Sequence, residues 1–236
     1  AIDLAAAATH GVTVSNVPAT MAEACADHTF GLLLAARRRI VETDRAMRAG
    51  DSQRLTMHSW LGADVAGTQL GLVGFGDIAR AVARRAVGFE MTVVHHNRSR
   101  TADDSSRWVE FDELLATSDI VSLHVPLSAE TRHLIDAAAL ARMRPTATLV
   151  NTARGPVVDE RALIDALAAG RLHSAALDVF EHEPLAADHP LLQFSNVVVS
   201  PHAASATEST RTAMVARAVA NVLAVLDGDP PPDAIV

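Results

Sequence analysis

The apolar residues of this chain follow two alternating patterns, one of short continuous runs and one with helical spacing. The runs predict strands at residues 69–74, 91–95, 120–125, 147–151, 174–179 and 197–200. The residues between them predict one helix that ends at residue 88, one at residues 111–116 and one at residues 159–169. Because strands and helices alternate and the strands are mostly apolar, we predict an α/β fold with a doubly wound parallel sheet.

Residues 19–49 predict a single long helix before this alternating region. Thr20 and Glu23 have the spacing of a capping box, and Gly50 is a stop signal. Three consecutive arginines, residues 37–39, raise the question of an anion site. We favour the alternative that they are cations in the later part of an amphipathic helix, facing solvent or a partner subunit.

The two ends of the chain lie outside the alternating region. Residues 1–11 are helix-like, residues 12–18 predict a strand, and residues 206–226 predict the last long helix. The first strand has no predicted neighbour with which to pair. Because the sequence also lacks an initial methionine, we expect the chain to be a fragment of a longer protein.

Composition narrows the class of protein. Hydrophobic residues make up 49% of the 236 residues, which supports a sizeable core. The net charge of -8 disfavours nucleic acid or an anionic membrane as the main partner. Cys25 is the single cysteine, and no apolar stretch reaches the roughly 20 residues of a membrane span. Since no signal peptide is recognisable either, we expect a cytoplasmic protein that binds small molecules.

A glycine-rich turn follows the first strand of the alternating region. Gly74, Gly76 and Ala79 have the spacing G-x-G-x-x-A between an apolar strand and a helix. In a dinucleotide site, such glycines permit a tight turn and a close approach of the pyrophosphate, and the helix N-terminus attracts the phosphates. We therefore predict a dinucleotide site rather than a glycine-rich turn without a ligand. Asp77 and Ile78 belong to the same turn, and the Asp77 carboxylate is expected to face solvent.

The end of the next strand indicates which dinucleotide is preferred. NAD-selective sites place an aspartate or glutamate about 20 residues after the glycines, where it binds the ribose 2′-hydroxyl. Asn97 occupies this position here, and Arg98, Ser99 and Arg100 follow it with two positive charges and a hydroxyl. These groups suit a 2′-phosphate, so we expect NADP, with NAD possible. The alternative is that they are ordinary solvated loop residues.

Three polar residues in the second half of the chain lie in motifs at the ends of predicted strands. Arg154 lies in NTARGPVVD, Glu183 in DVFEHEP and His202 in SPHAAS. Ligands of parallel α/β sheets bind outside the carboxyl ends of the strands, so these side chains can converge on one crevice. An arginine can hold a carboxylate with two parallel donors, and a histidine beside a carboxylate suits a general acid. Taken alone, His202 is more simply a structural histidine, one of eleven in the chain.

With these motifs, the chain resembles the D-2-hydroxyacid dehydrogenase family over nearly its whole length. The resemblance rests on GLVGFGDIA, HVPLSAETRHLI, NTARGPVVDERAL, ALDVFEHEPL and SPHAAS, which occur in the family's order and at its spacings. It implies an oxidoreductase that transfers hydride between NAD(P)H and a small 2-oxo acid. Within the family, the chain is most similar to the glyoxylate and hydroxypyruvate reductase branch, which also includes 2-ketogluconate reductases.

The resemblance implies roles for individual residues. Arg154 would clamp the substrate carboxylate, His202 would protonate the carbonyl oxygen during reduction, and Glu183 would orient and charge His202. Asp178 and Thr152 would lie beside the nicotinamide. Val125 and Pro126 would lie in the loop that passes over the adenosine.

The resemblance also implies a domain organisation. Residues 1–18 would be the remnant of a flavodoxin-like substrate domain, and residues 19–205 a Rossmann dinucleotide-binding domain with an N-terminal helical arm. Residues 206–236 would form a helix and tail that return toward the substrate domain. Because the family commonly dimerises through its cofactor domains, a homodimer is expected.

Two other functions stay open at this point. Some relatives of this fold sense dinucleotides without catalysis, and such proteins can retain all three polar residues. The chain could also be an inactive fragment, because the expected substrate domain would carry backbone amides that help Arg154 and would close the cleft against water. The histidine spacings match no metal motif, so no metal site is expected.

Overall fold

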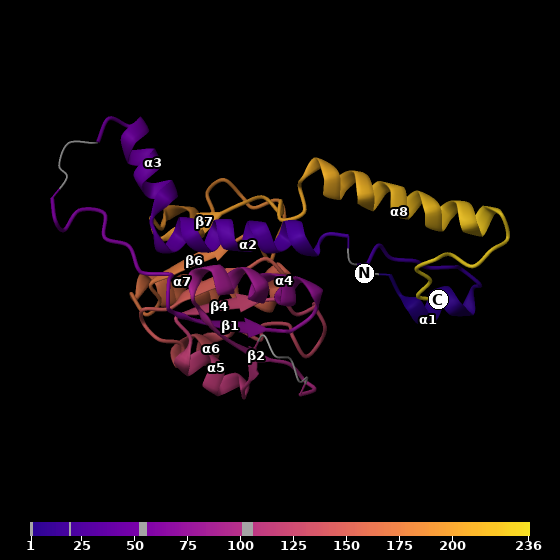
Figure 1. Cartoon of the computed structure of the whole chain (residues 1–236), viewed down its shortest axis with the longest axis horizontal. Coiled ribbons are helices and arrows are strands. Elements are labelled where there is room, and N and C mark those ends of the chain that lie inside the picture. Colours follow the sequence, from indigo (N-terminus) through magenta and orange to yellow (C-terminus); the bar gives the residue numbers. More distant parts are fainter. Residues whose placement is uncertain (1, 19, 52–55, 101–105) are drawn as a thin grey trace. The chain divides into compact units, whose positions relative to one another are not determined.

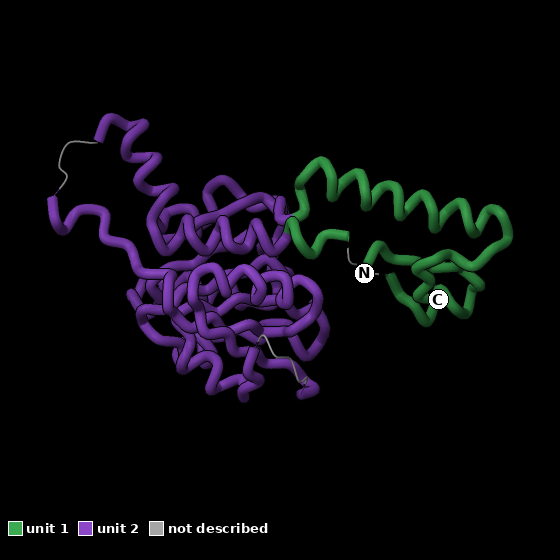
Figure 2. Tube along the Cα trace, in the orientation of Figure 1, with its two compact units in different colours: residues 1–24, 205–236 green, residues 25–204 purple. Residues whose placement is uncertain are grey.

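The computed structural model describes residues 2–18, 20–51, 56–100 and 106–236. The chain divides into two compact units, which Figure 2 distinguishes by colour. The larger unit is Cys25–Ala204, and the smaller unit combines Ala1–Ala24 with Ser205–Val236. All of the residues predicted to act in catalysis or in cofactor binding belong to the larger unit.

The larger unit is built on one sheet of seven parallel strands (Figure 1). The strands lie in the order β3-β2-β1-β4-β5-β6-β7, so the direction of winding reverses at β1. This reversal defines a doubly wound sheet and confirms the predicted fold class. The strands are β1 (Gln69–Val73), β2 (Thr92–His96), β3 (Arg107–Trp108), β4 (Ile120–Leu123), β5 (Thr148–Asn151), β6 (Ser174–Leu177) and β7 (Val197–Val199).

Helices cover both faces of this sheet, as its apolar strands require. Figure 1 shows α5 and α6 on the side of the sheet away from α2. The core on the α5 side includes Leu114, Leu140 and Leu163, and the core on the α2 side includes Leu33 and Val82. The helices between the strands are α4 (Asp77–Ala86), α5 (Phe111–Thr117), α6 (Ala137–Arg142) and α7 (Glu160–Ala168), with 3-10 turns at Val87–Phe89, Gly155–Val157 and Pro190–Gln193.

The carboxyl ends of the central strands lie at one edge of the sheet. Val73 at the end of β1 is in register with Leu123 of β4, and Leu123 with Asn151 of β5. Asn151 is in register with Leu177 of β6, and Leu177 with Val199 of β7. The loops that follow these residues therefore begin side by side, which brings motifs far apart in the sequence to the same edge.

Apart from the 3-10 turns, two described elements of the larger unit were not predicted from the sequence. β3 has two residues and α6 has six, so neither contains enough positions to establish a period. Asp136 caps α6, because its carboxylate accepts a hydrogen bond from the Ala139 amide at 2.8 Å. A local cap, rather than an amphipathic pattern, therefore marks the start of this helix.

The prediction of one helix over residues 19–49 is wrong, because two helices occupy this segment. α2 spans Ala22–Arg37 and α3 spans Ile40–Arg48. Between them Arg39 has a φ of 55°, in the left-handed region that a right-handed helix excludes. The Arg39 guanidinium donates to both carboxylate oxygens of Glu42 at 2.7 Å. The apolar residues keep their helical spacing across the break, so the sequence pattern does not reveal the break.

The interpretation of residues 37–39 as surface cations is wrong for Arg37, which is 4% exposed. Its Nε donates to the Asp64 carbonyl at 2.7 Å, and its Nη1 donates to the Asp119 carbonyl at 2.9 Å. Burial lowers the pKa of the Arg37 guanidinium, and the Asp119 carboxylate partly offsets this effect. Arg37 therefore ties α2 to the segments that precede β1 and β4.

The predicted capping box at the start of α2 is not formed. The helix begins at Ala22, two residues after Thr20. The buried Thr20 hydroxyl has no hydrogen-bond partner within the described part of the chain. Thr20 therefore does not cap α2.

The smaller unit contains α1 (Leu4–Thr9) and α8 (Glu208–Leu226). The strand predicted over residues 12–18 is wrong, because this segment makes an isolated antiparallel bridge between Ser15 and Ala234. The Val14 carbonyl accepts a hydrogen bond from the Ile235 amide at 2.7 Å. The pairing partner thus comes from the C-terminal tail, which the pattern of either segment alone cannot reveal.

Candidate active site

The glycine-rich turn between β1 and α4 has the geometry that a dinucleotide site requires. Gly74 has a φ of +88°, and a Cβ added there would lie 2.7 Å from the His124 carbonyl oxygen. A Cβ added at Gly76 would have no neighbouring atom within 4 Å. This open space lies at the N-terminus of α4, whose amides can hold a pyrophosphate, so the residues present fit such a group. Asp77 is exposed, as predicted, and Ile78 is half-buried.

A pocket of about 290 Å³ lies at the carboxyl ends of β1 and β2 and the loop after β4. Four residues that the sequence placed at the cofactor line this pocket together: Asn97, Arg98, Val125 and Pro126. Apolar atoms of Phe111 and Leu134 also line it, which suits a planar base. Its position at the point where the winding reverses is the usual one for the adenosine half of a dinucleotide.

The two arginines after Asn97 are placed differently, although the sequence suggested that both would face a phosphate. Arg98 lines the pocket and is exposed. The Arg100 guanidinium instead lies 4.2 Å from the centre of the Trp108 ring and 3.7 Å from a carboxylate oxygen of Glu110. Ser99 is exposed and is not part of the pocket lining. Arg98 is therefore the arginine available to a ligand in this pocket.

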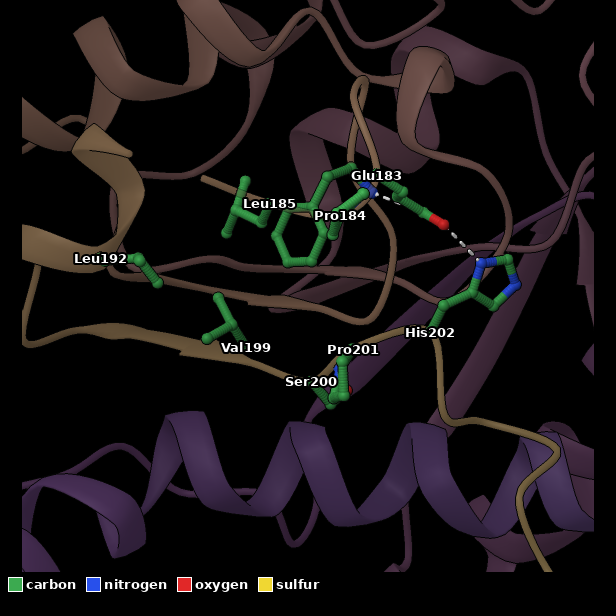
Figure 3. Close-up of a pocket in the computed structure, with 9 residues that line it drawn as sticks. Glu183, Pro184, Leu185, Leu192, Val199, Ser200, Pro201 and His202 are labelled. Atoms are coloured by element: carbon green, nitrogen blue, oxygen red, sulfur yellow. Dashed lines mark hydrogen bonds and ion pairs between the residues drawn. The ribbon is translucent and has the colours of Figure 1, made fainter. Parts of the chain in front are cut away.

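The imidazole of His202 and the carboxylate of Glu183 face each other, as Figure 3 shows. His202 Nδ1 lies 2.8 Å from Glu183 Oε2, and Glu183 Oε1 accepts a hydrogen bond from the Phe180 amide at 3.0 Å. The backbone of His202, with a φ of 54°, is held by its amide, which donates to the Asp178 carbonyl at 2.7 Å. With Nδ1 bound to a carboxylate, Nε2 is the ring nitrogen that can exchange a proton with a ligand.

The loop that carries Glu183 is fixed by neighbouring carboxylates. The Glu181 amide donates to Glu160 Oε1 at 2.6 Å, and the Glu160 amide donates to Glu181 Oε1 at 3.3 Å. His133 Nε2 lies 2.8 Å from Glu181 Oε1. Burial raises the pKa of the Glu160 carboxyl, although the hydrogen bond from Glu181 opposes this shift. These contacts hold the loop from both sides and so orient Glu183.

Arg154 lies in a tight turn after β5. The Asn151 side chain spans this turn, since its Nδ2 donates to the Arg154 carbonyl and its Oδ1 accepts from the Ala153 amide, both at 3.0 Å. Arg154 is exposed, and its Nη1 donates to the Ala153 carbonyl at 2.6 Å. Next to it, a Cβ added at Gly155 would lie 1.8 Å from the Phe180 carbonyl oxygen. The turn of Arg154 therefore packs directly on the loop of Glu183.

Asp178 is fully buried at the end of β6. Its Oδ1 accepts from the Ser200 hydroxyl at 2.5 Å and from the Ala203 amide at 2.8 Å. Its Oδ2 accepts from the Ala204 amide at 2.8 Å. A buried carboxylate is stable only with such donors, so the segment that carries His202 is fixed to β6 through Asp178.

Another cavity, of about 580 Å³, opens beside the pair of Glu183 and His202 (Figure 3). Apart from this pair and Ser200, its lining is apolar and consists of Phe180, Pro184, Leu185, Leu192, Val199 and Pro201. The close-up shows Leu185, Leu192 and Val199 at a distance from the imidazole. The reactive groups therefore lie at the polar end of a mostly apolar hollow.

Sequence reasoning missed the contribution of α2 to this edge of the sheet. The Thr29 hydroxyl lies 3.0 Å from that of Thr152, the residue after β5, and both are buried. His28 lies 2.9 Å from Ser200. A polar residue in a helix is normally taken to face solvent, so only the packing of α2 reveals these contacts.

The described residues contain neither a metal-ligand cluster nor a membrane-spanning helix. In residues 2–18, 20–51, 56–100 and 106–236, no three His, Cys, Asp or Glu side chains are grouped so that they could hold a metal ion. Within the same ranges, no helix has the length and apolar character needed to cross a membrane.

Comparisons with known proteins bear on the family of this chain. The family model of the D-isomer specific 2-hydroxyacid dehydrogenase NAD binding domain matches residues 30–204. A glyoxylate reductase of Korarchaeum cryptofilum is 46% identical over 240 residues, covering 99% of this chain and 72% of that protein. A crystal structure of a Thermus thermophilus protein has a TM-score of 0.96 and 44% identity, covering 100% of this chain and 75% of that one.

Similar solved structures contain NADPH, NADP or NAD, and one of them also contains malonate. It is an NADPH-dependent glyoxylate/hydroxypyruvate reductase from Sinorhizobium meliloti in complex with NADP and malonate. Its TM-score is 0.92 at 32% identity, and the match covers 100% of this chain and 74% of that chain.

The fold and the glycine-rich turn together define a Rossmann dinucleotide-binding domain. With the family model matching most of the chain and a relative at 46% identity, the chain belongs to the D-isomer specific 2-hydroxyacid dehydrogenase family. It is an oxidoreductase whose cofactor is a nicotinamide dinucleotide.

Proposed function

We propose that this chain reduces small 2-oxo acids, of the size of glyoxylate and hydroxypyruvate, to D-2-hydroxy acids with NADPH. The observation that carries the proposal is the pair of His202 and Glu183, 2.8 Å apart at the sheet edge that also holds the glycine-rich turn. The names of the similar reductases from Korarchaeum cryptofilum and Sinorhizobium meliloti support this substrate class.

Arg154, His202 and Glu183 have different roles in the proposed reduction. Arg154, exposed on its turn, binds the substrate carboxylate with two parallel donors and so orients the neighbouring carbonyl. His202 donates a proton to the carbonyl oxygen as negative charge develops there, and Glu183 keeps the imidazole oriented. When bound, the cofactor supplies the hydride. Asp178 and Thr152 are proposed to contact the nicotinamide end.

The proposal is tested by the rate at which the purified chain oxidises NADPH and NADH in the presence of glyoxylate or hydroxypyruvate. Turnover that depends on both the 2-oxo acid and the reduced cofactor is the expected result. Binding of the cofactor without turnover would contradict the enzyme assignment for this chain and favour a dinucleotide-binding module. The loss of reduced-nicotinamide absorbance gives the rate directly.

Replacing Arg98 with alanine is expected to lower kcat/KM for NADPH about tenfold and to leave kcat/KM for NADH nearly unchanged. Arg98 is the arginine that lines the adenosine pocket, and a 2′-phosphate is the group that distinguishes the two cofactors there. Arg100→Ala is the matched control, since that guanidinium is occupied by Trp108 and Glu110. An equal loss for both cofactors in Arg98→Ala would refute the 2′-phosphate role.

We further propose that the chain forms a homodimer through an arm that consists of α3 and residues 56–61. α3 and the segment after it carry apolar side chains that are exposed to solvent: Ile40 at 52%, Met47 at 64%, Met57 at 91% and Leu61 at 60%. A series of exposed apolar side chains along one arm is typical of a subunit contact. Sedimentation equilibrium tests this directly, and a monomer at micromolar concentration would contradict it.

A further inference from the structure

Asp178 contacts a residue of α2 that no sequence motif singles out. His28 Nε2 lies 2.9 Å from Ser200 Oγ and 3.3 Å from Asp178 Oδ1. The Ser200 hydroxyl is itself 2.5 Å from Asp178 Oδ1. Side chains from α2, from the end of β7 and from the end of β6 therefore form one hydrogen-bonded chain, and all three belong to the larger unit.

The positions of the protons in these hydrogen bonds follow from which of the three side chains can donate and which can accept. An ionised carboxylate can only accept hydrogen bonds, so the Ser200 hydroxyl donates its proton to Asp178. That hydroxyl has no second proton, so it accepts from His28 Nε2, which must carry a hydrogen. The direction is therefore from His28 through Ser200 to Asp178. His28 thereby fixes the rotation of the Ser200 hydroxyl.

The donors around Asp178 are unevenly distributed between its two oxygens. Oδ1 accepts from the Ser200 hydroxyl and the Ala203 amide, and His28 lies close to the same oxygen. Oδ2 accepts from the Ala204 amide. Because a carboxylate offers about four acceptor positions, Oδ2 keeps a position for one more N–H group. The amide of the nicotinamide carboxamide is such a group.

We propose that His28 is a positioning residue for the nicotinamide end of the cofactor. By holding Asp178 Oδ1 through Ser200, it fixes the direction in which Oδ2 of this buried carboxylate faces when the carboxamide binds. This inference rests on the proposed function, because it requires the nicotinamide to lie beside Asp178.

The next residue of α2 supports the same nicotinamide end of the site. The Thr29 hydroxyl donates to the Cys25 carbonyl at 2.7 Å, so at 3.0 Å it accepts from the hydroxyl of Thr152. Thr152 is the other residue proposed to contact the nicotinamide. Consecutive positions of α2 therefore fix the side-chain orientation of both proposed contacts, and this makes α2 a direct support of the site.

The test compares binding of complete cofactors with binding of fragments that lack the nicotinamide. The probes are NADPH and NADH, together with ADP-ribose and its 2′-phosphate. His28→Leu removes the donor but keeps an apolar side chain, so we expect about tenfold weaker binding of the complete cofactors and unchanged binding of the fragments. His28→Gln carries an amide N–H that can replace Nε2–H and should bring the affinity back to within about threefold of the wild type.

Steady-state kinetics provide a second readout. His28→Leu should raise KM for the reduced cofactor while leaving KM for the 2-oxo acid unchanged, because Arg154 and His202 are not altered. Ser200→Ala breaks the same hydrogen-bonded chain at its middle member and should reproduce the His28→Leu pattern. It also keeps the test decisive if His28→Leu fails to fold.

Each possible result supports or overturns the inference. Equal losses of affinity for complete cofactors and fragments in His28→Leu would make His28 a purely structural residue. Unchanged affinities in this variant would show that His28 has no role. Either result overturns the inference, while turnover by the wild-type chain leaves the proposed function standing. A wild-type chain that binds complete cofactors no more tightly than the fragments would overturn the inference, because the nicotinamide would then add nothing to the affinity. Absence of turnover by the wild-type chain would overturn the proposed function.

Discussion

His202→Asn should lower turnover of 2-oxo acids by about 10³-fold and leave the affinity for NADPH nearly unchanged. Asparagine suits this position because the backbone has a φ of 54°, a conformation that asparagine adopts more readily than alanine. Its amide can still bind Glu183, so the loop keeps its support, but it cannot transfer a proton to a carbonyl oxygen. Steady-state kinetics with glyoxylate or hydroxypyruvate measure the first effect, and a fluorescence titration with NADPH measures the second.

The matched control is His182→Asn, the same substitution one residue before Glu183 at an exposed position. It should change turnover less than about twofold, since His182 does not line the cavity beside His202. A His202→Asn variant that loses cofactor affinity as much as turnover would contradict the general-acid role and point to a binding role instead.

Six of the seven strands of the sheet were predictable from the sequence because they are mostly buried. β4, β5 and β6 are fully buried along their lengths, so each appears in the sequence as a mostly apolar run. The break between α2 and α3 was not predictable, because the residue before it contacts distant parts of the folded chain. Arg37, the last residue of α2, donates to the carbonyls of residues 64 and 119 in the folded chain. Such long-range contacts to the backbone leave no local pattern.

The candidate site was predictable to the extent that its residues follow strands. Asp178 directly follows β6, and Asn97 directly follows β2, so the topology alone brings them to one edge. His28 and Thr29 were not identified, because helical periodicity cannot distinguish a polar residue facing solvent from one facing a buried carboxylate. The different positions of Arg98 and Arg100 likewise depend on Trp108, which is brought close by the short strand β3.

Gly155 lies at the contact between the turn of Arg154 and the loop of Glu183, which were predicted from separate motifs. Its backbone has no left-handed φ, so its requirement for glycine is not conformational. A Cβ there would lie 1.8 Å from the Phe180 carbonyl oxygen and 2.5 Å from the Glu181 nitrogen. Both of these atoms belong to backbone that is hydrogen-bonded to Glu183 or to Glu160, and so neither can move without disturbing that loop.

Gly155→Ala should therefore lower the free energy of unfolding by about 3 kcal/mol and reduce kcat/KM by about 100-fold. The added methyl group forces the turn of Arg154 away from the loop of Glu183, which misplaces both the substrate clamp and the support of His202. Denaturant unfolding and steady-state kinetics measure the two effects. Gly88→Ala is the matched control, since a Cβ there meets no atom within 4 Å. If Gly155→Ala kept wild-type activity, the contact between these two loops would be irrelevant to the placement of the site.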